Sequence, residues 1–422
     1  MNQELISKSY EIAKERYGEY GVDTDEIIKQ MNKLPISLHC WQGDDVGGFE
    51  NPDAKLSGGG IQATGNYPGK ARNLEELQMD IEKVMSLLPG KQKFNLHASY
   101  GDFTGNKKVD RDAITIDNFK PWIDWAKKQG IGLDFNCTCF SHPKADSGFT
   151  ITSKNSDIRD FWLEHIKRCR EIAAQFGKKL GIPSIHNLWI PDGSKDIPVD
   201  RAGHRKLLKA ALDEIFAINY SRDHMKDSIE SKLFGIGSEA MVVGSYDFYW
   251  GYAAQNDKLI CLDNGHYHPT EQVSDKISAC LLFVDELMLH VTRGVRWDSD
   301  HVVILNDEIQ AIFQEIVRAG ALDRVNVGLD FFDASINRIG AYITGTRAAQ
   351  KALLFALLEP GKILLDYEEK GQNFERLFLL EKMKSMPWGA VWDYYCMQEN
   401  VISDDAVIAE VQAYEKAVLA KR

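Results

Sequence analysis

The sequence contains no uninterrupted apolar run near the ~18 residues that a membrane-spanning helix requires. Its opening residues, MNQELISKSYEIAKERYGEYG, carry charges throughout, which is unlike a secretory signal. Basic residues form no long run either, and 50 Lys and Arg against 62 Asp and Glu leave a formal net charge of −12. Because an acidic surface repels phosphate backbones, we expect neither a membrane nor a nucleic-acid partner.

Cysteine is also scarce, and its spacing does not indicate a disulfide framework. The seven cysteines are odd in number, and most of them lie inside apolar runs. This pattern is typical of reduced, buried thiols, so we expect a cytoplasmic protein.

A nucleotide-binding glycine motif is missing as well. The segment 57–70, SGGGIQATGNYPGK, comes closest, but it is neither a dinucleotide fingerprint nor a phosphate-binding loop. Ala71 stands where such a loop needs Ser or Thr. We interpret this segment as part of a mobile loop over one end of the fold.

What the chain does contain is an alternation of short apolar runs with amphipathic stretches. At 44% hydrophobic and 10% aromatic residues, it has ample material for a core. Strand followed by helix, repeated, indicates a parallel sheet, and eight repeats favour a closed (β/α)8 TIM barrel of the α/β class. The expected strands are residues 36–41, 93–100, 132–139, 184–191, 227–232, 259–266, 287–291 and 324–331. The expected helices are 74–88, 119–129, 158–176, 201–216, 273–286 and 307–319.

Helical patterns flank this repeat on both sides. Ile6, Tyr10, Ala13 and Tyr17 recur at helical spacing near the start, and the stretch after residue 331 has only helical patterns, at 339–358, 373–385 and 405–421. We therefore expect an N-terminal helical segment at 1–34, a catalytic barrel at 35–345 and a C-terminal helical extension at 346–422.

The last four expected strands each end in acidic or imidazole side chains. In barrels of this kind the carboxyl ends of the strands form the reactive rim. Each acid by itself could be a helix cap or a turn residue, but so many buried acids together must be paired or must bind cations. Mixed carboxylate and imidazole donors favour Mn²⁺, with Co²⁺, Mg²⁺ or Zn²⁺ as alternatives, and their number exceeds one coordination shell. The acidic and imidazole residues are Glu230, Asp263, His266, His290, Asp298, Asp300, Asp330 and Asp333, and Lys232 ends the first of these strands.

Long, composition-rare strings run through the same regions. They are HCWQGDD at 39–45, GFEN at 48–51, ATGNYPGKA at 63–71, ESKLFG at 230–235, GHYHPT at 265–270, RWDSDH at 296–301 and GLDFFDASIN at 328–337. With these strings, nearly the whole chain resembles the L-rhamnose isomerase family, which belongs to the xylose-isomerase-like barrels. The resemblance implies isomerisation of L-rhamnose to L-rhamnulose, the first step of rhamnose catabolism, by a metal-assisted hydride shift.

The resemblance also implies a homotetramer, a lid at residues 44–70 and two divalent cations per subunit, with Mn²⁺ expected. Their expected ligands are Glu230, Asp263, His290 and Asp330 for a structural cation, and His266, Asp298 and Asp300 for a catalytic one. Asp333 is an alternative to Asp330, which we favour because it falls at the end of its strand.

The remaining candidates surround the sugar. Lys232 is expected beside O1, where its ammonium would stabilise developing negative charge. Asp300 and Asp330 would orient the water that moves a proton between the two oxygens, and His97 would bind O5 or assist ring opening. Trp41, Trp189 and Phe331 are the expected substrate-binding aromatics.

Other functions remain open from the residues alone. One is isomerisation of another aldose on the same barrel, and a second is metal-dependent hydrolysis on this fold. An enediol route with a free base at C2 is the alternative to the hydride shift. The physiological metal and the secondary sugar specificity are also left open, because pocket shape and metal availability decide them.

Overall fold

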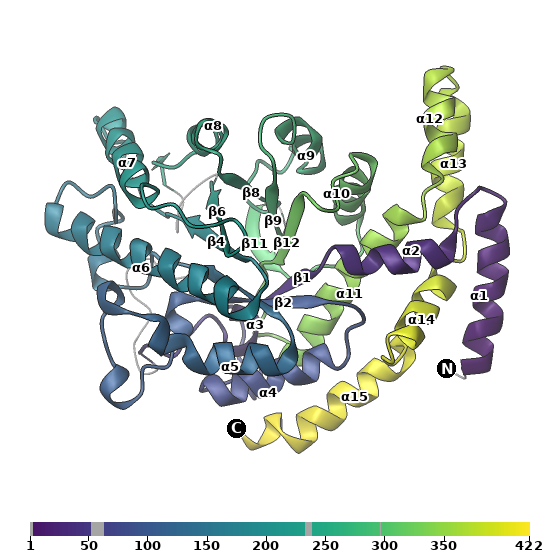
Figure 1. Cartoon of the computed structure of the whole chain (residues 1–422), viewed down its shortest axis with the longest axis horizontal. Helices are drawn as coiled ribbons and strands as arrows, with labels where there is room; N and C mark the ends of the chain where they lie inside the picture. The colour runs from purple at the N-terminus through teal and green to yellow at the C-terminus, as the bar shows by residue number, and fades with distance from the viewer. Residues whose placement is uncertain (1–2, 52–62, 233–238, 296) are drawn as a thin grey trace.

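Eight parallel strands close into a barrel at the centre of the molecule (Figure 1). The structure is a computed structural model that describes residues 3–51, 63–232, 239–295 and 297–422. Neighbouring strands follow chain order, and the last pairs with the first. This confirms the predicted TIM barrel. The strands are β1 (Ile36–His39), β2 (Gln92–His97), β3 (Gly132–Asn136), β4 (Ser184–Trp189), β6 (Met225–Glu230), β8 (Leu259–Asp263), β9 (Leu287–Val291) and β12 (Val325–Leu329).

Helices follow the barrel strands and cover the outside of the barrel. Their apolar faces pack on outward-pointing strand residues such as Leu38, Phe94 and Leu133, which belong to the main core. The helices are α4 (Leu74–Met85), α5 (Lys120–Gln129), α6 (Ser156–Leu180), α7 (Arg201–Ile215), α8 (Tyr246–Asn256), α9 (Ser274–Cys280), α10 (Asp307–Arg318) and α11 (Arg338–Leu357).

The interior of the barrel is polar along much of its length. Successive strand residues point to opposite faces, so Ser37 and His39 point inward while Leu38 points outward. Ser37 Oγ, for example, donates a hydrogen bond to Asp134 Oδ2 across the interior at 2.7 Å. This alternation decides which side chains can reach the functional rim.

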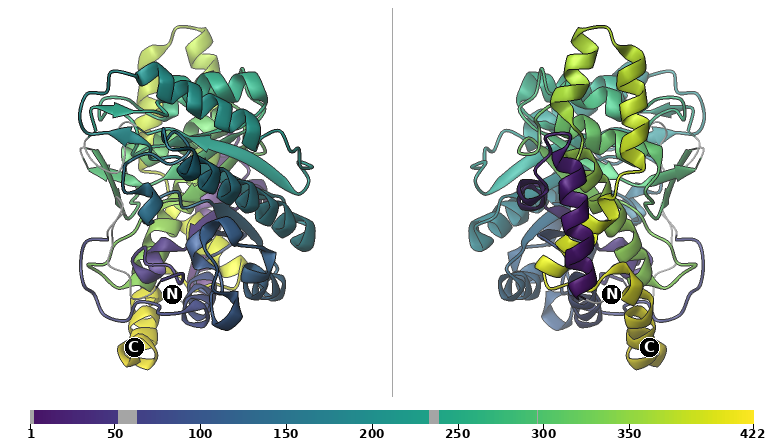
Figure 2. Two further views of the ribbon diagram at one scale, coloured as in Figure 1. Left: turned by 90° about the vertical axis from the view of Figure 1, so that its left-hand side faces the viewer. Right: turned by 90° about the vertical axis from the view of Figure 1, so that its right-hand side faces the viewer.

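The terminal helices pack against each other beside the barrel (Figures 1 and 2). In α1, the four residues at helical spacing are buried as expected, and the ring of Tyr10 stacks on Tyr394 of α14 at 3.8 Å. At the C-terminus, Arg422 Nη1 lies 2.6 Å from Asp80 Oδ2 of α4. The helices are α1 (Gln3–Gly18), α2 (Thr24–Gln30), α12 (Gly361–Glu369), α13 (Asn373–Lys384), α14 (Trp388–Gln398) and α15 (Asp404–Ala417). The segment boundary expected at 345/346 falls within α11.

Several elements differ from the expectation. Helix α8 was not predicted, because its segment YDFYWGYAAQN has aromatic residues on several sides and so lacks an amphipathic period. The stretch 273–286 forms only the short helix α9. Residues expected in a loop form a hairpin of β10 (Arg293–Val295) and β11 (Trp297–His301). Also unpredicted were α12, α14, the short helix α3 (Trp41–Asp44), and the short strands β5 (Gly193–Ser194) and β7 (Met241–Val242).

The expected lid at 44–70 includes residues 52–62, which lie outside the described residues. Its two described flanks are joined by the buried Arg338, at the start of α11. Arg338 Nε donates to Asp45 Oδ1 at 2.7 Å, and Nη1 donates to the carbonyl of Pro68 at 3.1 Å. Among the described helices, none combines the length and apolar character that a membrane crossing demands.

Candidate active site

Acidic and imidazole side chains gather at the carboxyl end of the barrel. Glu230 and Asp263 end β6 and β8, His290 lies in β9, and Asp330 follows β12. All four are buried, with at most 8% of each residue exposed. Parallel strands of a closed barrel end on one rim, so these groups meet although they are up to 100 residues apart in the chain.

These four side chains surround one point. One donor atom from each lies within 4.8 Å of those of the other three. His290 Nδ1 lies 3.3 Å from Glu230 Oε2, 3.4 Å from Asp330 Oδ2 and 3.8 Å from Asp263 Oδ2. Three carboxylates and an imidazole in this arrangement can hold a divalent cation, and they are the four residues expected for the structural cation.

A second group adjoins the first. His266 Nε2 lies 3.3 Å from Asp298 Oδ2 of β11 and 3.5 Å from Asp263 Oδ2. Its Nδ1 donates to the carbonyl of Ser231 at 2.8 Å, which leaves the lone pair on Nε2 facing the acids. Among the described residues, His266, Asp298 and Asp300 do not themselves form a set as close as the first four. Lys232 Nζ instead lies 2.8 Å from Asp298 Oδ2.

Several buried polar atoms of the two groups have no hydrogen-bond partner among the residues that the structure describes. They include Asp263 Oδ2, Asp298 Oδ1, Asp300 Oδ1 and both ring nitrogens of His290. Leaving a buried polar atom without a partner costs about 1–3 kcal/mol, and more for a charged group. The donor atoms are therefore suited to cations, because a bound cation would supply the partner that these atoms lack.

The titration behaviour of the acids supports the same conclusion. Burial raises the pKa of Asp263 to about 8 and that of Asp330 to about 6. Burial and the neighbouring Asp298 raise the pKa of Asp300 well above its ordinary value. Although burial opposes protonation of His266, the Asp263 and Asp298 carboxylates raise its pKa. Without cations, protons thus offset the negative charge that cations would neutralise.

A cavity with aromatic walls opens beside these groups. Lys232 Nζ lies 4.7 Å from the centre of the Trp189 ring, and the rings of Trp41 and His97 are 4.2 Å apart. Burial lowers the pKa of His97 well below its usual value, so this imidazole is neutral. Besides the acids, the cavity is lined by Trp41, His97, Asn136, Trp189, Lys232, His266 and His290. Of the residues expected at the sugar, Phe331 does not line this cavity.

Phe331, which was predicted as a substrate contact, is not among the residues that line the cavity. Because neighbouring residues of an extended chain face opposite ways, Asp330 and Phe331 cannot both point into the barrel. Phe331 instead packs on α11, where a Cβ on Gly345 would lie 2.4 Å from its ring. The next residue, Phe332, contacts Trp41 with ring centres 5.8 Å apart.

Asp333, the alternative to Asp330, has a local role. Its Oδ1 accepts hydrogen bonds from the backbone N–H and the hydroxyl of Ser335, at 2.8 and 2.5 Å. Its backbone N–H donates to Gln42 Oε1 at 2.8 Å. Asp333 thus stabilises a turn, and the geometry favours Asp330 as the ligand.

Sequence reasoning missed three polar residues beneath the rim. His39, Asn136 and Asn187 point into the barrel from β1, β3 and β4. Asn187 Nδ2 donates to Glu230 Oε2 at 2.5 Å, and His39 Nε2 lies 3.0 Å from Asp330 Oδ1. Strand alternation could have found them, because residues two positions apart on a strand point to the same face, and each of these residues shares its face with another inward-pointing residue.

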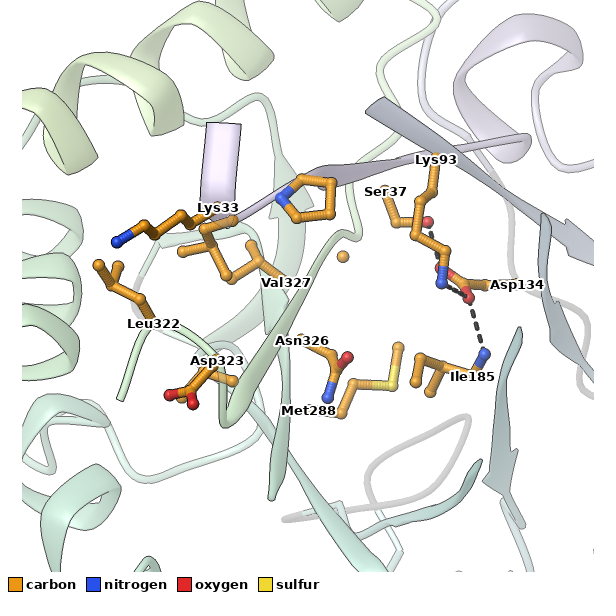
Figure 3. A pocket seen from close by; sticks show the side chains of 14 residues that line it. Lys33, Ser37, Lys93, Asp134, Ile185, Met288, Leu322, Asp323, Asn326 and Val327 are labelled. Atoms are coloured by element: carbon orange, nitrogen blue, oxygen red, sulfur yellow. Dashed lines mark hydrogen bonds and ion pairs between the residues drawn. The ribbon is translucent and has the colours of Figure 1, made fainter. Parts of the chain in front are cut away.

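A further cavity lies at the opposite end of the barrel (Figure 3). There Lys93, the hydroxyl of Ser37 and the backbone N–H of Ile185 converge on Asp134. Lys93 Nζ also donates to the carbonyl of Pro183 at 3.0 Å. These charged groups are already paired, which is typical of the stabilising end of such barrels rather than of a reactive one.

The fold and the site define a (β/α)8 barrel whose rim carries four donors that could hold a divalent cation, and comparison with known proteins identifies the family. The family model L-rhamnose isomerase (RhaA) matches residues 4–422. The L-rhamnose isomerase of Bacteroides thetaiotaomicron is 56% identical over 420 residues, covering 100% of this chain and 99% of that protein. Those of Escherichia coli strain SE11 and Escherichia fergusonii are each 53% identical over 417 residues, covering 99% of both chains. The chain belongs to the L-rhamnose isomerase family.

Proposed function

We propose that this protein isomerises the aldose L-rhamnose to the ketose L-rhamnulose, as the first step of rhamnose catabolism. One observation carries the proposal. The four-donor set, formed by Glu230, Asp263, His290 and Asp330, lies beside Lys232 and an aromatic-walled cavity. A sugar needs polar groups for its hydroxyls and aromatic faces for its C–H bonds, and this cavity offers both.

Two divalent cations, Mn²⁺ in the first instance, are proposed as the cofactors. Glu230, Asp263, His290 and Asp330 would hold one of them, and His266, Asp298 and Asp300 would hold the other. When bound, such cations supply Lewis-acid polarisation of the sugar oxygens. The unpartnered atoms of Asp263, Asp298 and His290 support this assignment.

The reaction moves hydrogen from C2 to C1 and a proton from O2 to O1. In the proposed route the C2 hydrogen passes to C1 with its electron pair, as a hydride. Lys232 is proposed to stabilise the negative charge that develops on O1. Burial opposes its charge, but Asp298 and Asp300 raise its pKa, so the ammonium remains charged. Asp300 and Asp330 are proposed to guide the proton between the oxygens.

The rest of the cavity is proposed to orient the sugar. Trp41 and Trp189 would stack against its C–H faces, while the neutral His97 would bind O5. His97 Nδ1 lies 3.0 Å from Thr138 Oγ1, which leaves Nε2 for the sugar. Holding the open chain in one orientation brings C1 and C2 into the geometry that the transfer requires.

The proposal is tested on protein stripped of metal with a chelator. Stripped protein should form no ketose from L-rhamnose, and added Mn²⁺ should restore ketose formation. Turnover that survives stripping would refute the metal assignment, and restored activity only on another aldose would replace the substrate. In D₂O, product without deuterium at C1 supports the hydride shift, whereas solvent deuterium at C1 indicates an enediol route.

We further propose a cytoplasmic homotetramer. All seven cysteines are free and buried, which suits a reducing compartment. The α12–α13 hairpin exposes Phe374, Leu377 and Phe378 by 73, 61 and 62%, and burial of these side chains between subunits would favour association. Sedimentation velocity on the purified protein tests this assembly.

A further inference from the structure

We propose that His39 is a positioning residue that aligns Asp330 for cation binding, and that Asn95 and Asn136 orient His39. The inference rests on the proposed function, because Asp330 is there a proposed ligand. None of these three residues was among the catalytic, metal-binding or substrate-binding candidates from the sequence.

The four side chains come from four neighbouring strands. In barrel order these are β3, β2, β1 and β12, which carry or directly precede Asn136, Asn95, His39 and Asp330. Asn136 Nδ2 donates to Asn95 Oδ1 at 2.8 Å, and Asn95 Nδ2 lies 3.5 Å from His39 Nδ1. His39 Nε2 then lies 3.0 Å from Asp330 Oδ1. The series leads from a neutral amide to a proposed cation ligand.

The direction of each contact follows from the one before it. Asn136 presents an N–H to the Asn95 oxygen, so the Asn95 amide must present its own N–H₂ to His39. His39 Nδ1 is then the acceptor, and in a neutral imidazole the remaining proton lies on Nε2. That proton lies on the ring nitrogen nearest Asp330 Oδ1, 3.0 Å away. Within the described chain neither His39 Nε2 nor Asp330 Oδ1 has a hydrogen-bond partner, so a small rotation of the ring would let each satisfy the other.

The two carboxylate oxygens of Asp330 therefore contact different groups. Oδ1 lies against His39, whereas Oδ2 lies 3.4 Å from His290 Nδ1, on the side of the four-donor set. Glu230 is also contacted from the first half of the barrel, because its Oε2 accepts from Asn187 while lying 3.3 Å from His290 Nδ1. Strands β1 and β4 thus supply neutral side chains that contact the carboxylates of two proposed cation ligands.

His39 cannot act on the sugar directly. It is 2% exposed and does not line the cavity. The hydroxyl of Tyr342 donates to its backbone carbonyl, and its ring packs against Trp41 with centres 4.5 Å apart. Its polar contact with the proposed cation ligands is through Asp330, so an effect of His39 on cation binding must pass through that residue.

Two near-isosteric substitutions separate the role of each ring nitrogen. In His39→Gln the amide nitrogen takes the place of Nε2 and keeps a donor facing Asp330. In His39→Asn the amide reaches only the position of Nδ1, and the donor is lost. Losing an outer partner of a metal ligand typically costs 10–100-fold in metal affinity. We expect His39→Asn to weaken one of the two Mn²⁺ sites by about that factor, and His39→Gln to stay within about threefold of the unaltered protein.

Mn²⁺ binding is measured directly, by electron paramagnetic resonance of free Mn²⁺ during titration of the stripped protein. His204→Gln is the matched control, because His204 is a buried histidine whose Nδ1 contacts the carbonyl of Thr152 and which does not line the active-site cavity. It should bind Mn²⁺ normally. Absence of Mn²⁺ binding in the unaltered protein would refute the proposed function itself. With binding intact there, unchanged affinity in His39→Asn, or equal losses in both His39 variants, would refute the positioning role.

Discussion

Replacing Lys232 with Met gives the sharpest test of the proposed chemistry, because two roles for this lysine lead to opposite results. Its side chain is 10% exposed, and Nζ lies 2.8 Å from Asp298 Oδ2. If the ammonium stabilises charge on the reacting oxygen, its loss lowers kcat. If it merely neutralises Asp298, its loss leaves kcat unchanged and strengthens cation binding at that acid.

The structure sets the expected magnitude. Two unit charges at the 2.8 Å separation of Lys232 and Asp298 attract by about 6 kcal/mol at an effective dielectric constant of about 20. Half a unit of charge developing on O1 at a similar distance would be stabilised by about 3 kcal/mol. Since about 1.36 kcal/mol corresponds to a tenfold change in rate, Lys232→Met should lower kcat by about 10²-fold, with little change in KM.

The assay is ketose formation from L-rhamnose at saturating Mn²⁺, with Mn²⁺ affinity measured on the same preparation. Lys93→Met is the matched control, because Lys93 is paired with Asp134 at the opposite end of the same barrel (Figure 3). It should lower stability and leave kcat unchanged. An unchanged kcat in Lys232→Met, or an effect confined to KM, would refute the role in the transition state.

Three further results are expected. Asp298→Asn should abolish turnover and weaken Mn²⁺ binding by more than about 100-fold, with an unaltered circular dichroism spectrum; near-normal turnover would remove Asp298 from the site. Mn²⁺ affinity should fall as pH is lowered, because His266 and His290 must lose protons before they bind the cation. Burial opposes their protonation, but neighbouring acidic groups raise the pKa of both imidazoles. Calorimetry in buffers of different ionisation enthalpy should therefore detect proton release, and its absence would contradict this coupling. Asp227→Asn should lower the free energy of unfolding by about 3–5 kcal/mol in urea titrations, because it leaves the buried Arg170 without its bidentate partner, at 2.8 and 2.9 Å. Asp227 faces away from the rim, so a large fall in kcat there would be unexpected.

The sequence was sufficient for those features that depend on local patterns. The eight barrel strands are short apolar runs bounded by polar residues, and all eight were predicted within a few residues. The four residues that surround one point were among the candidates selected because they stand at or near strand ends, and their grouping as one set of ligands came from the family resemblance. In contrast, α8 was missed because its aromatic residues occur on several sides, and a period cannot be read from such a segment.

Tertiary structure decided which side chains meet. Strand β1 pairs with β12 only when the barrel closes, and this closure brings His39 within 3.0 Å of Asp330, 291 positions later in the chain. Closure and the backbone path beyond β12 also turn Phe331 toward α11 and Phe332 toward Trp41. Local sequence determines the type and periodicity of each element, because these depend on neighbouring residues. The contacts across the barrel depend on register between distant strands, which is settled only when all eight pack together.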